Sequence, residues 1–167
     1  MEIKGFKAFN SDLTNNYGNI FLEGETYHID GDISFGINGN GYHFCKRLED
    51  TFRYISDDNK RVAQVTGFGE IKEGFDDYNE YYDMYSASSL TINHILEREE
   101  VLNYILHANE FCVLRFIVTG FKLTNDEILM FRNYFANSLI INKYIDYYLL
   151  NDKRAFNQET NCKILKK

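Results

Sequence analysis

Residues 1–96 show the short apolar alternation of strands, whereas the rest of the chain shows the longer period of helices. Segments 3–9, 61–71 and 85–95 place apolar side chains at roughly every second position, the spacing of a strand with one buried face. Clusters of Gly, Asn, Asp and Ser separate these segments and are typical of turns. We therefore predict a mostly antiparallel, aromatic sheet over residues 1–96.

Two turns and one short helix are predicted between the strands of this sheet. Segments 20–22 and 26–29 flank a Glu-Gly-Glu sequence, which indicates a β-hairpin. Gly39 and Gly41 allow a turn with positive φ, and a short aromatic strand follows them. A helical spacing then appears once, and its apolar face consists of Leu48, Phe52 and Ile55.

From residue 97 onward the apolar spacing is helical. The first apolar stripe consists of Val101, Leu102, Ile105 and Leu106. Residues 111–121 are predicted to form a buried helix and residues 139–150 a last amphipathic one. Thr124 and Glu127 have the spacing of a capping box, which indicates a helix start.

These patterns predict an α+β protein with a β-rich domain at 1–96 and a helical region at 97–167. The helices carry more apolar surface than one helical hairpin can bury, so we expect them to pack on the sheet.

Charge is distributed unevenly along the 167 residues, which have a net charge of −7. Residues 1–96 contain eight Lys and Arg against sixteen Asp and Glu, and residues 70–83 are predicted to form an acidic, aromatic loop. Such a surface repels a polyanion, so nucleic acid is not an expected partner. A protein partner that recognises the acidic, aromatic surface is the alternative.

Several other classes of protein and site have little support in the sequence. The three cysteines are far apart and form no CxxC pair, and the four histidines show no pairing typical of metal ligands. No apolar run is long enough to span a membrane, and the first residues lack the apolar core of a secretory signal. We expect a cytoplasmic protein without a metal site.

Residues 4–96 resemble an uncharacterised domain family found in phages and bacteria. The resemblance rests on a lysine-containing first strand, a Gly-x-x-Tyr hairpin and a Gly-x-His-x-Cys element. These are followed by a Val-x-Gly-x-Gly/Glu-Ile strand and a Ser-x-Leu-Thr-Ile ending. The matching residues are 6–9, 24–27, 41–45, 65–71 and 88–92. This resemblance implies no known activity.

A weaker resemblance links the chain to ADP-ribosyltransferases and poly(ADP-ribose) polymerases. The sequence from Gly39 to Cys45, followed by Tyr54, is similar to the Gly-x-Gly-x-Tyr-Phe-Ala…Tyr element of that family. Residues 62–67 are similar to its next strand, and residues 78–81 match the Tyr-Asn-Glu-Tyr that holds its catalytic glutamate. The resemblance implies a split β-sheet that binds NAD in an aromatic cleft.

Roles for individual residues follow from this second resemblance. It implies Glu80 and His43 as catalytic residues, with His43 in the place of one stacking tyrosine. It implies that NAD contacts Lys7, Gly41, Tyr42 and Tyr54. Lys7 stands where the family has a His or Arg that anchors the ribose. A carboxylate near the ribose would stabilise the cation that develops when the nicotinamide bond breaks.

Each of these residues also has an ordinary structural interpretation. His43 on an alternating strand fits a half-buried, hydrogen-bonded histidine, Tyr54 fits the boundary of a core, and Glu80 fits a solvated loop. Three hypotheses for function therefore stand together. The first is a small NAD-dependent ADP-ribosyltransferase-like enzyme. The second is a non-catalytic protein-binding module, and the third is a phage-derived effector that inhibits a host protein.

Overall fold

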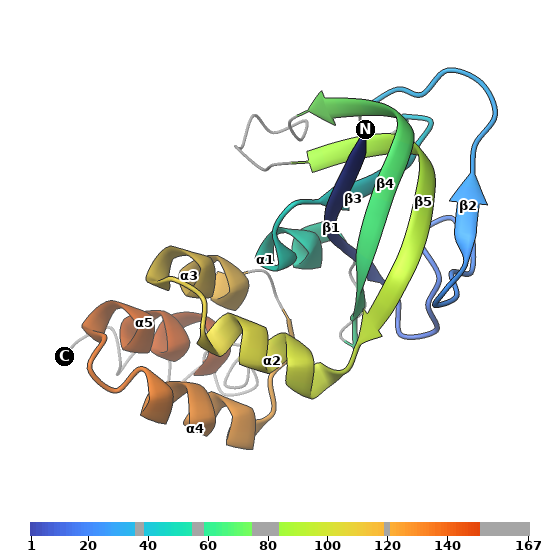
Figure 1. Ribbon diagram of the computed structural model, residues 1–167. Helices are drawn as coiled ribbons and strands as arrows, with labels where there is room; N and C mark the ends of the chain where they lie inside the picture. Colours follow the sequence, from blue (N-terminus) through green and yellow to red (C-terminus); the bar gives the residue numbers. More distant parts are fainter. Residues whose placement is uncertain (36–38, 55–58, 75–83, 119–120, 151–167) are drawn as a thin grey trace. The chain divides into compact units, whose positions relative to one another are not determined.

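The computed structural model describes residues 1–35, 39–54, 59–74, 84–118 and 121–150. The chain divides into two compact units, Met1–Asn103 and Tyr104–Lys167, and each is described by itself. The first unit contains a five-stranded antiparallel sheet, and the second is helical (Figure 1). This confirms the predicted α+β class. The expected packing of the helices on the sheet concerns the relative placement of the units and stays a prediction.

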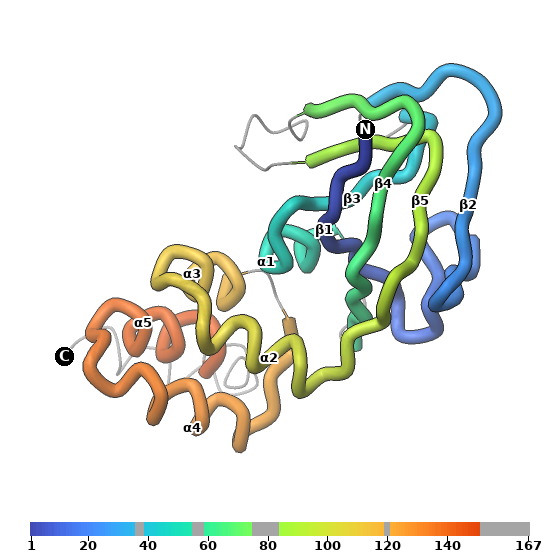
Figure 2. The backbone as a smooth tube through the Cα atoms, in the orientation of Figure 1, coloured from blue at the N-terminus to red at the C-terminus, as the bar shows by residue number. Residues whose placement is uncertain are grey.

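The strands of the first unit pair in an order that brings distant segments together. They are β1 (Glu2–Phe9), β2 (Thr26–His28), β3 (Tyr42–Cys45), β4 (Arg61–Gly74) and β5 (Met84–Leu96). The sheet order is β2-β5-β3-β1-β4, and every pair is antiparallel. Because β4 also pairs with β5, the four strands β1, β4, β5 and β3 close into a ring (Figure 2).

A bulge in β4 bends the long β4–β5 hairpin. Gly69 has a φ of 81° and lies where the pairing shifts between Phe68 and Ile71. The extra residues leave the Glu70 amide to donate a hydrogen bond to the Ser88 hydroxyl, at 3.0 Å. Bulges increase strand twist, and strong twist is what lets so few strands close on themselves.

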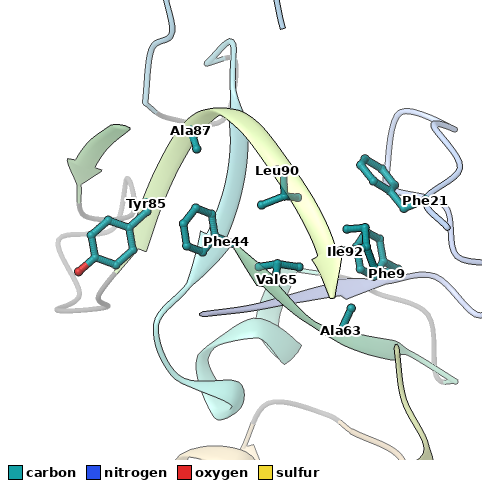
Figure 3. Close-up of a cluster of buried hydrophobic side chains, with 9 residues drawn as sticks. All are labelled: Phe9, Phe21, Phe44, Ala63, Val65, Tyr85, Ala87, Leu90 and Ile92. Carbon is teal, nitrogen blue, oxygen red and sulfur yellow. The ribbon is translucent and has the colours of Figure 1, made fainter. Parts of the chain in front are cut away.

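The four closed strands surround an aromatic core centred on Phe44, which is 1% exposed. The Phe44 ring stacks on Tyr85 with centroids 5.5 Å apart, and Figure 3 shows it between Tyr85 and Val65. Two glycines make room for it, because a Cβ at Gly5 would lie 2.9 Å and one at Gly67 2.4 Å from Phe44 ring atoms. The interior is therefore packed around one large ring.

Two local predictions for the sheet unit are wrong. Residues 20–22 and 26–29 do not form a hairpin, because β2 pairs with β5 and Ile20 forms only an isolated bridge with Thr14. The Gly24 amide donates to the Ile92 carbonyl instead, at 2.8 Å. The predicted acidic loop also begins too early, because β4 continues to Gly74. The rest of that loop lies outside the described residues.

The predicted short helix is confirmed. It consists of α1 (Leu48–Thr51) and a 3-10 turn, η1 (Phe52–Tyr54). Leu48 and Phe52 are both completely buried, as the apolar spacing predicts. The third residue of the predicted face, Ile55, lies outside the described residues.

The helical part begins with α2 (Arg98–Leu106), which crosses the boundary between the units, and continues with α3 (Glu110–Val118), α4 (Asn125–Tyr134) and α5 (Leu139–Tyr144). A π-helical turn, η2 (Ile145–Leu149), follows α5. The predicted capping box is confirmed, because the Thr124 amide donates to the Glu127 carboxylate at 2.6 Å and the Glu127 amide to the Thr124 hydroxyl at 3.3 Å. None of the described helices is long and apolar enough to cross a membrane.

Replacing Gly67 by alanine tests the close packing around Phe44. The new Cβ would lie 2.4 and 2.5 Å from two ring carbons of Phe44, so the buried ring must move. Overpacking of this kind costs about 1–3 kcal/mol, which urea unfolding would measure. Phe44→Leu in the same chain should recover part of the loss, because the smaller side chain leaves space for the methyl group. If the losses in unfolding free energy of the two single variants simply add in the double variant, the proposed contact is contradicted.

Candidate functional site

His43 lies on the face of β3 opposite Phe44, because neighbouring residues of a strand point to opposite faces. Its ring packs edge-on against Phe35, with centroids 5.3 Å apart. Burial lowers the pKa of His43, and the nearby Lys7 charge lowers it further, although a hydrogen bond to the Gly41 backbone opposes both effects. Its Nε2 atom is buried, and no described residue hydrogen-bonds to it. The imidazole is therefore neutral at pH 7.

Lys7, on the neighbouring strand β1, contacts β3 at the backbone of His43. Its ammonium donates a hydrogen bond to the His43 carbonyl at 2.6 Å and lies 5.8 Å from the centre of the Phe9 ring. Loss of hydration lowers the pKa of Lys7 to about 8, and the neighbouring Cys45 acts in the opposite direction. The side chain thus ties β1 to β3 at a half-buried position.

Tyr54 lies near the end of the same strands. Its hydroxyl contacts the Met84 sulfur at 2.8 Å, and the Arg53 guanidinium lies 5.5 Å from the centre of its ring. Met84 pairs with Cys45 across β3 and β5, two residues along from His43. The structure therefore places Lys7, His43 and Tyr54 around one end of β3, although their sequence positions span almost fifty residues.

Gly41 and Tyr42, the other residues implied in NAD binding, have different surroundings. Gly41 has a φ of 143°, and a Cβ there would lie 2.0 Å from the Ser86 hydroxyl oxygen, so its backbone closely approaches β5. The Tyr42 ring points to the face opposite His43 and has edge contacts with Phe21 and Tyr27. Its hydroxyl donates to the His28 carbonyl at 3.2 Å. Tyr42 therefore belongs to an aromatic cluster on the other side of β3.

The sixth implied residue, Glu80, lies outside the described residues. The described part of the chain contains no group of three His, Cys, Asp or Glu side chains that would hold a metal ion. The geometry at the end of β3 thus supplies a neutral imidazole, an amine with a lowered pKa and a phenol. The Lys7 ammonium and the Tyr54 hydroxyl already contact the His43 carbonyl and the Met84 sulfur, and the described residues do not define a carboxylate partner for the three groups.

A second feature, which the sequence reasoning missed, is the segment Tyr17–Glu25, here called the docking loop. Ile20 and Leu22 are 61% and 53% exposed, whereas Phe21 between them is 2% exposed. Phe21 packs on Phe9 and Tyr27, with ring centroids 5.1 and 4.8 Å away, and Figure 3 shows it beside Ile92. Its burial turns both aliphatic neighbours outward.

Hydrogen bonds fix the docking loop at both of its ends. The Asn15 side chain accepts from the backbone amides of Tyr17 and Asn19, each at 3.0 Å. The Leu22 amide donates to the Tyr27 hydroxyl at 2.8 Å, and the Phe21 amide donates to the Leu13 carbonyl. Exposure of the apolar side chains is therefore a property of an ordered loop.

His94 connects the docking loop to the end of β5 and the start of α2. Its Nε2 lies 3.1 Å from the Glu100 carboxylate and its Nδ1 lies 3.3 Å from that of Glu23. Glu23 also accepts from the Ile95 amide at 2.6 Å, and Glu100 from the Glu97 amide at 2.8 Å. The sequence gives no signal for this bridge, because Glu23 is 71 residues from its histidine.

The two carboxylates also explain the charge state of this bridge. Hydrogen bonds to Glu100 and then Glu23 raise the pKa of His94 above 6.5. Hydrogen bonds, first to backbone amides and then to His94, lower the pKa of both carboxyl groups below 4.5. The imidazolium is therefore favoured when the protein is folded.

The His94 bridge predicts a defined pH dependence of stability. The raised pKa means that the contribution of His94 is fully present below pH 6.5 and is lost as the pH rises through the folded value. The lowered carboxyl pKa values mean that Glu23 and Glu100 lose their contribution only as the pH falls below 4.5. Urea unfolding should therefore show a larger difference between the native protein and His94→Gln at about pH 5.5 than at about pH 8.5. His43 is present in both proteins and so does not contribute to this comparison. An equal difference in unfolding free energy at both pH values would exclude the bridge.

Residues 3–104 match the model of a protein family described as a domain of unknown function, DUF7666. No curated protein and no solved structure matches the chain. The matched span contains α1 and, apart from Glu2 at the start of β1, all five described strands, and it covers more than half of the chain. The chain therefore belongs to the DUF7666 family.

Proposed function

We propose that the sheet unit is a protein-binding module, and that its docking loop receives a basic, amphipathic segment of a partner protein. The observation that carries this proposal is the outward display of Ile20 and Leu22 by a loop anchored through buried Phe21. Exposed aliphatic side chains on an ordered loop lose little conformational entropy when a partner covers them. Binding therefore does not require additional free energy to order the loop.

The charge of residues 11–32, which include the docking loop, indicates which kind of partner segment would bind. Residues 11–32 contain five acidic residues and neither Lys nor Arg. The acidic residues are Asp12, Glu23, Glu25, Asp30 and Asp32. Glu23 and Glu25 lie within the docking loop itself, and an apolar surface that carries carboxylates matches a segment with apolar residues flanked by Lys or Arg. The same charge disfavours nucleic acid, as the sequence predicts.

A synthetic amphipathic peptide of Lys and Leu tests this function. NMR titration of the full chain should shift the amide signals of the docking loop, and binding should weaken with salt because the attraction is partly electrostatic. The double variant Ile20→Ser, Leu22→Ser should weaken binding about tenfold or more, because each buried aliphatic side chain contributes about 1.5–3 kcal/mol.

Two controls define what would contradict the proposal. Val118→Ser removes a comparably exposed aliphatic side chain from α3 and should leave binding unchanged. A peptide of Glu and Leu with the same apolar pattern should bind much more weakly. Equal binding of the two peptides, or equal losses from the two sets of variants, would show that the docking loop is not the site.

A second candidate function is an ADP-ribosyltransferase-like enzyme that uses NAD. The observation that favours it is that Lys7 binds the His43 backbone carbonyl, while Tyr54 contacts Met84, the residue paired with Cys45 at the same end of β3. A neutral imidazole presents an aromatic face for nicotinamide, and a cationic amine suits a pyrophosphate or ribose oxygen. Tyr42 points to the opposite face, so only part of the implied set shares this position.

A thermal-shift titration with NAD tests the enzyme candidate. A ligand at 100 times its Kd stabilises the native protein by about 2.7 kcal/mol, which raises the melting temperature by a measurable amount. If NAD is turned over, Glu80→Gln should lower the rate about 10²–10³-fold with little change in affinity. Asp76→Asn and Asp77→Asn make the same charge change and should have almost no effect. A melting temperature that does not respond to NAD would exclude this candidate.

A further inference from the structure

His94 places a titratable group directly beside the docking loop. Its Nδ1 lies 3.3 Å from the Glu23 carboxylate, and its Nε2 lies 3.1 Å from the Glu100 carboxylate of α2. In the docking loop, Glu23 comes immediately after the exposed Leu22. The His94 side chain is 43% exposed and each carboxylate is 48% exposed. A cationic side chain of a partner bound to the loop therefore reaches these carboxylates from solvent.

The charged groups that face this imidazole come from two segments of the first unit. Glu23 belongs to the docking loop and Glu100 to α2, whereas Gln64, the residue paired with the histidine on β4, is uncharged. The next charges, those of Arg61 and Glu97, lie 3.4 Å apart and pair with each other. Two carboxylates and one imidazolium give the bridge a net charge of −1, and two carboxylates with a neutral imidazole give it −2.

Loss of the imidazole proton changes this charge without releasing the carboxylates. Backbone amides also hold them, because the Ile95 amide donates to Glu23 at 2.6 Å and the Glu97 amide donates to Glu100 at 2.8 Å. Neither of these hydrogen bonds requires a charged histidine. Both carboxylates therefore keep their positions at either charge of the imidazole, and the change at the docking loop is one of electrostatic potential.

The histidine and the two carboxyl groups titrate in separate pH ranges. Hydrogen bonds to Glu100 and then Glu23 raise the pKa of His94 above 6.5. The pKa values of both carboxyl groups lie below 4.5, so these groups stay ionised while the imidazole changes its charge. As the pH rises through the neutral range, the bridge beside the docking loop therefore gains one negative charge.

We propose that the charge of His94 regulates the docking loop, so that a basic partner segment binds more tightly when the imidazole is neutral. This inference rests on the proposed function of the loop as the receptor for such a segment. A Lys or Arg side chain beside Glu23 is repelled by the imidazolium, and the repulsion ends once the proton has passed to solvent. Binding and loss of the proton therefore favour each other, because coupling between two sites is reciprocal.

Calorimetric titration of the full chain with the Lys and Leu peptide tests the proposal. The peptide is acetylated at its N-terminus, so that its own charge stays constant between about pH 5.5 and about pH 8.5. We expect about threefold tighter binding at the higher pH, the size of effect that one exposed charge typically has. His94→Gln removes the titrating charge and should bind with the tighter affinity at both pH values. His28→Gln, which removes an exposed histidine from β2, is the matched control and should retain the threefold difference.

The titration of His94 itself supplies a second measurement that needs no variant. Its imidazole NMR signals, followed against pH, should give an acid dissociation constant about three times larger with saturating peptide than without it. An unchanged constant, equal or weaker binding at the higher pH, or a His94→Gln variant that retains the difference would overturn this inference and leave the docking-loop function standing. Absence of peptide binding at both pH values would overturn the docking-loop function and this inference with it.

Discussion

The packing of the Phe44 ring inside the closed sheet is the constraint on which the rest of the first unit depends. Gly5 and Gly67 leave the space that the ring fills, and any side chain at either position would meet it. The Phe44 ring stacks on Tyr85, so one aromatic contact joins β3 to β5 inside the core. Because β4 and β5 also pair with each other, this core holds four strands in one arrangement.

The orientation of both candidate sites follows from that core. Alternation along β3 sends Phe44 inward and His43 to the opposite face, while the Lys7 ammonium of β1 binds the His43 backbone carbonyl. At the other end of the core, Phe21 joins Phe9 and Ile92, and its burial directs Ile20 and Leu22 away from the sheet. The docking loop is therefore an extension of the core, fixed from inside by an aromatic ring and from outside by Glu23. The candidate binding surface of this unit consists of side chains that the core directs outward.

The sequence predicted the elements that local spacing determines. The strand over residues 3–9 and the capping box at Thr124 depend on neighbours a few positions away, and both are confirmed. The predicted hairpin failed because its hydrogen bonds go to β5, more than sixty residues along the chain. The contact of Lys7 with His43 and the bridge at His94 likewise join distant residues. Spacing within one sequence contains no information on which strands become neighbours, so these contacts emerged only from the fold.

The central claim is that the docking loop presents its apolar side chains from an ordered backbone. Backbone ¹⁵N relaxation of the protein without a ligand measures this directly. The account predicts order parameters for residues 17–22 close to those of β5, about 0.85. Values below about 0.6 in this segment, with β5 still rigid, would mean that Phe21 and Asn15 do not fix the loop. The exposure of Ile20 and Leu22 would then reflect a mobile segment, and the binding-module account would be contradicted.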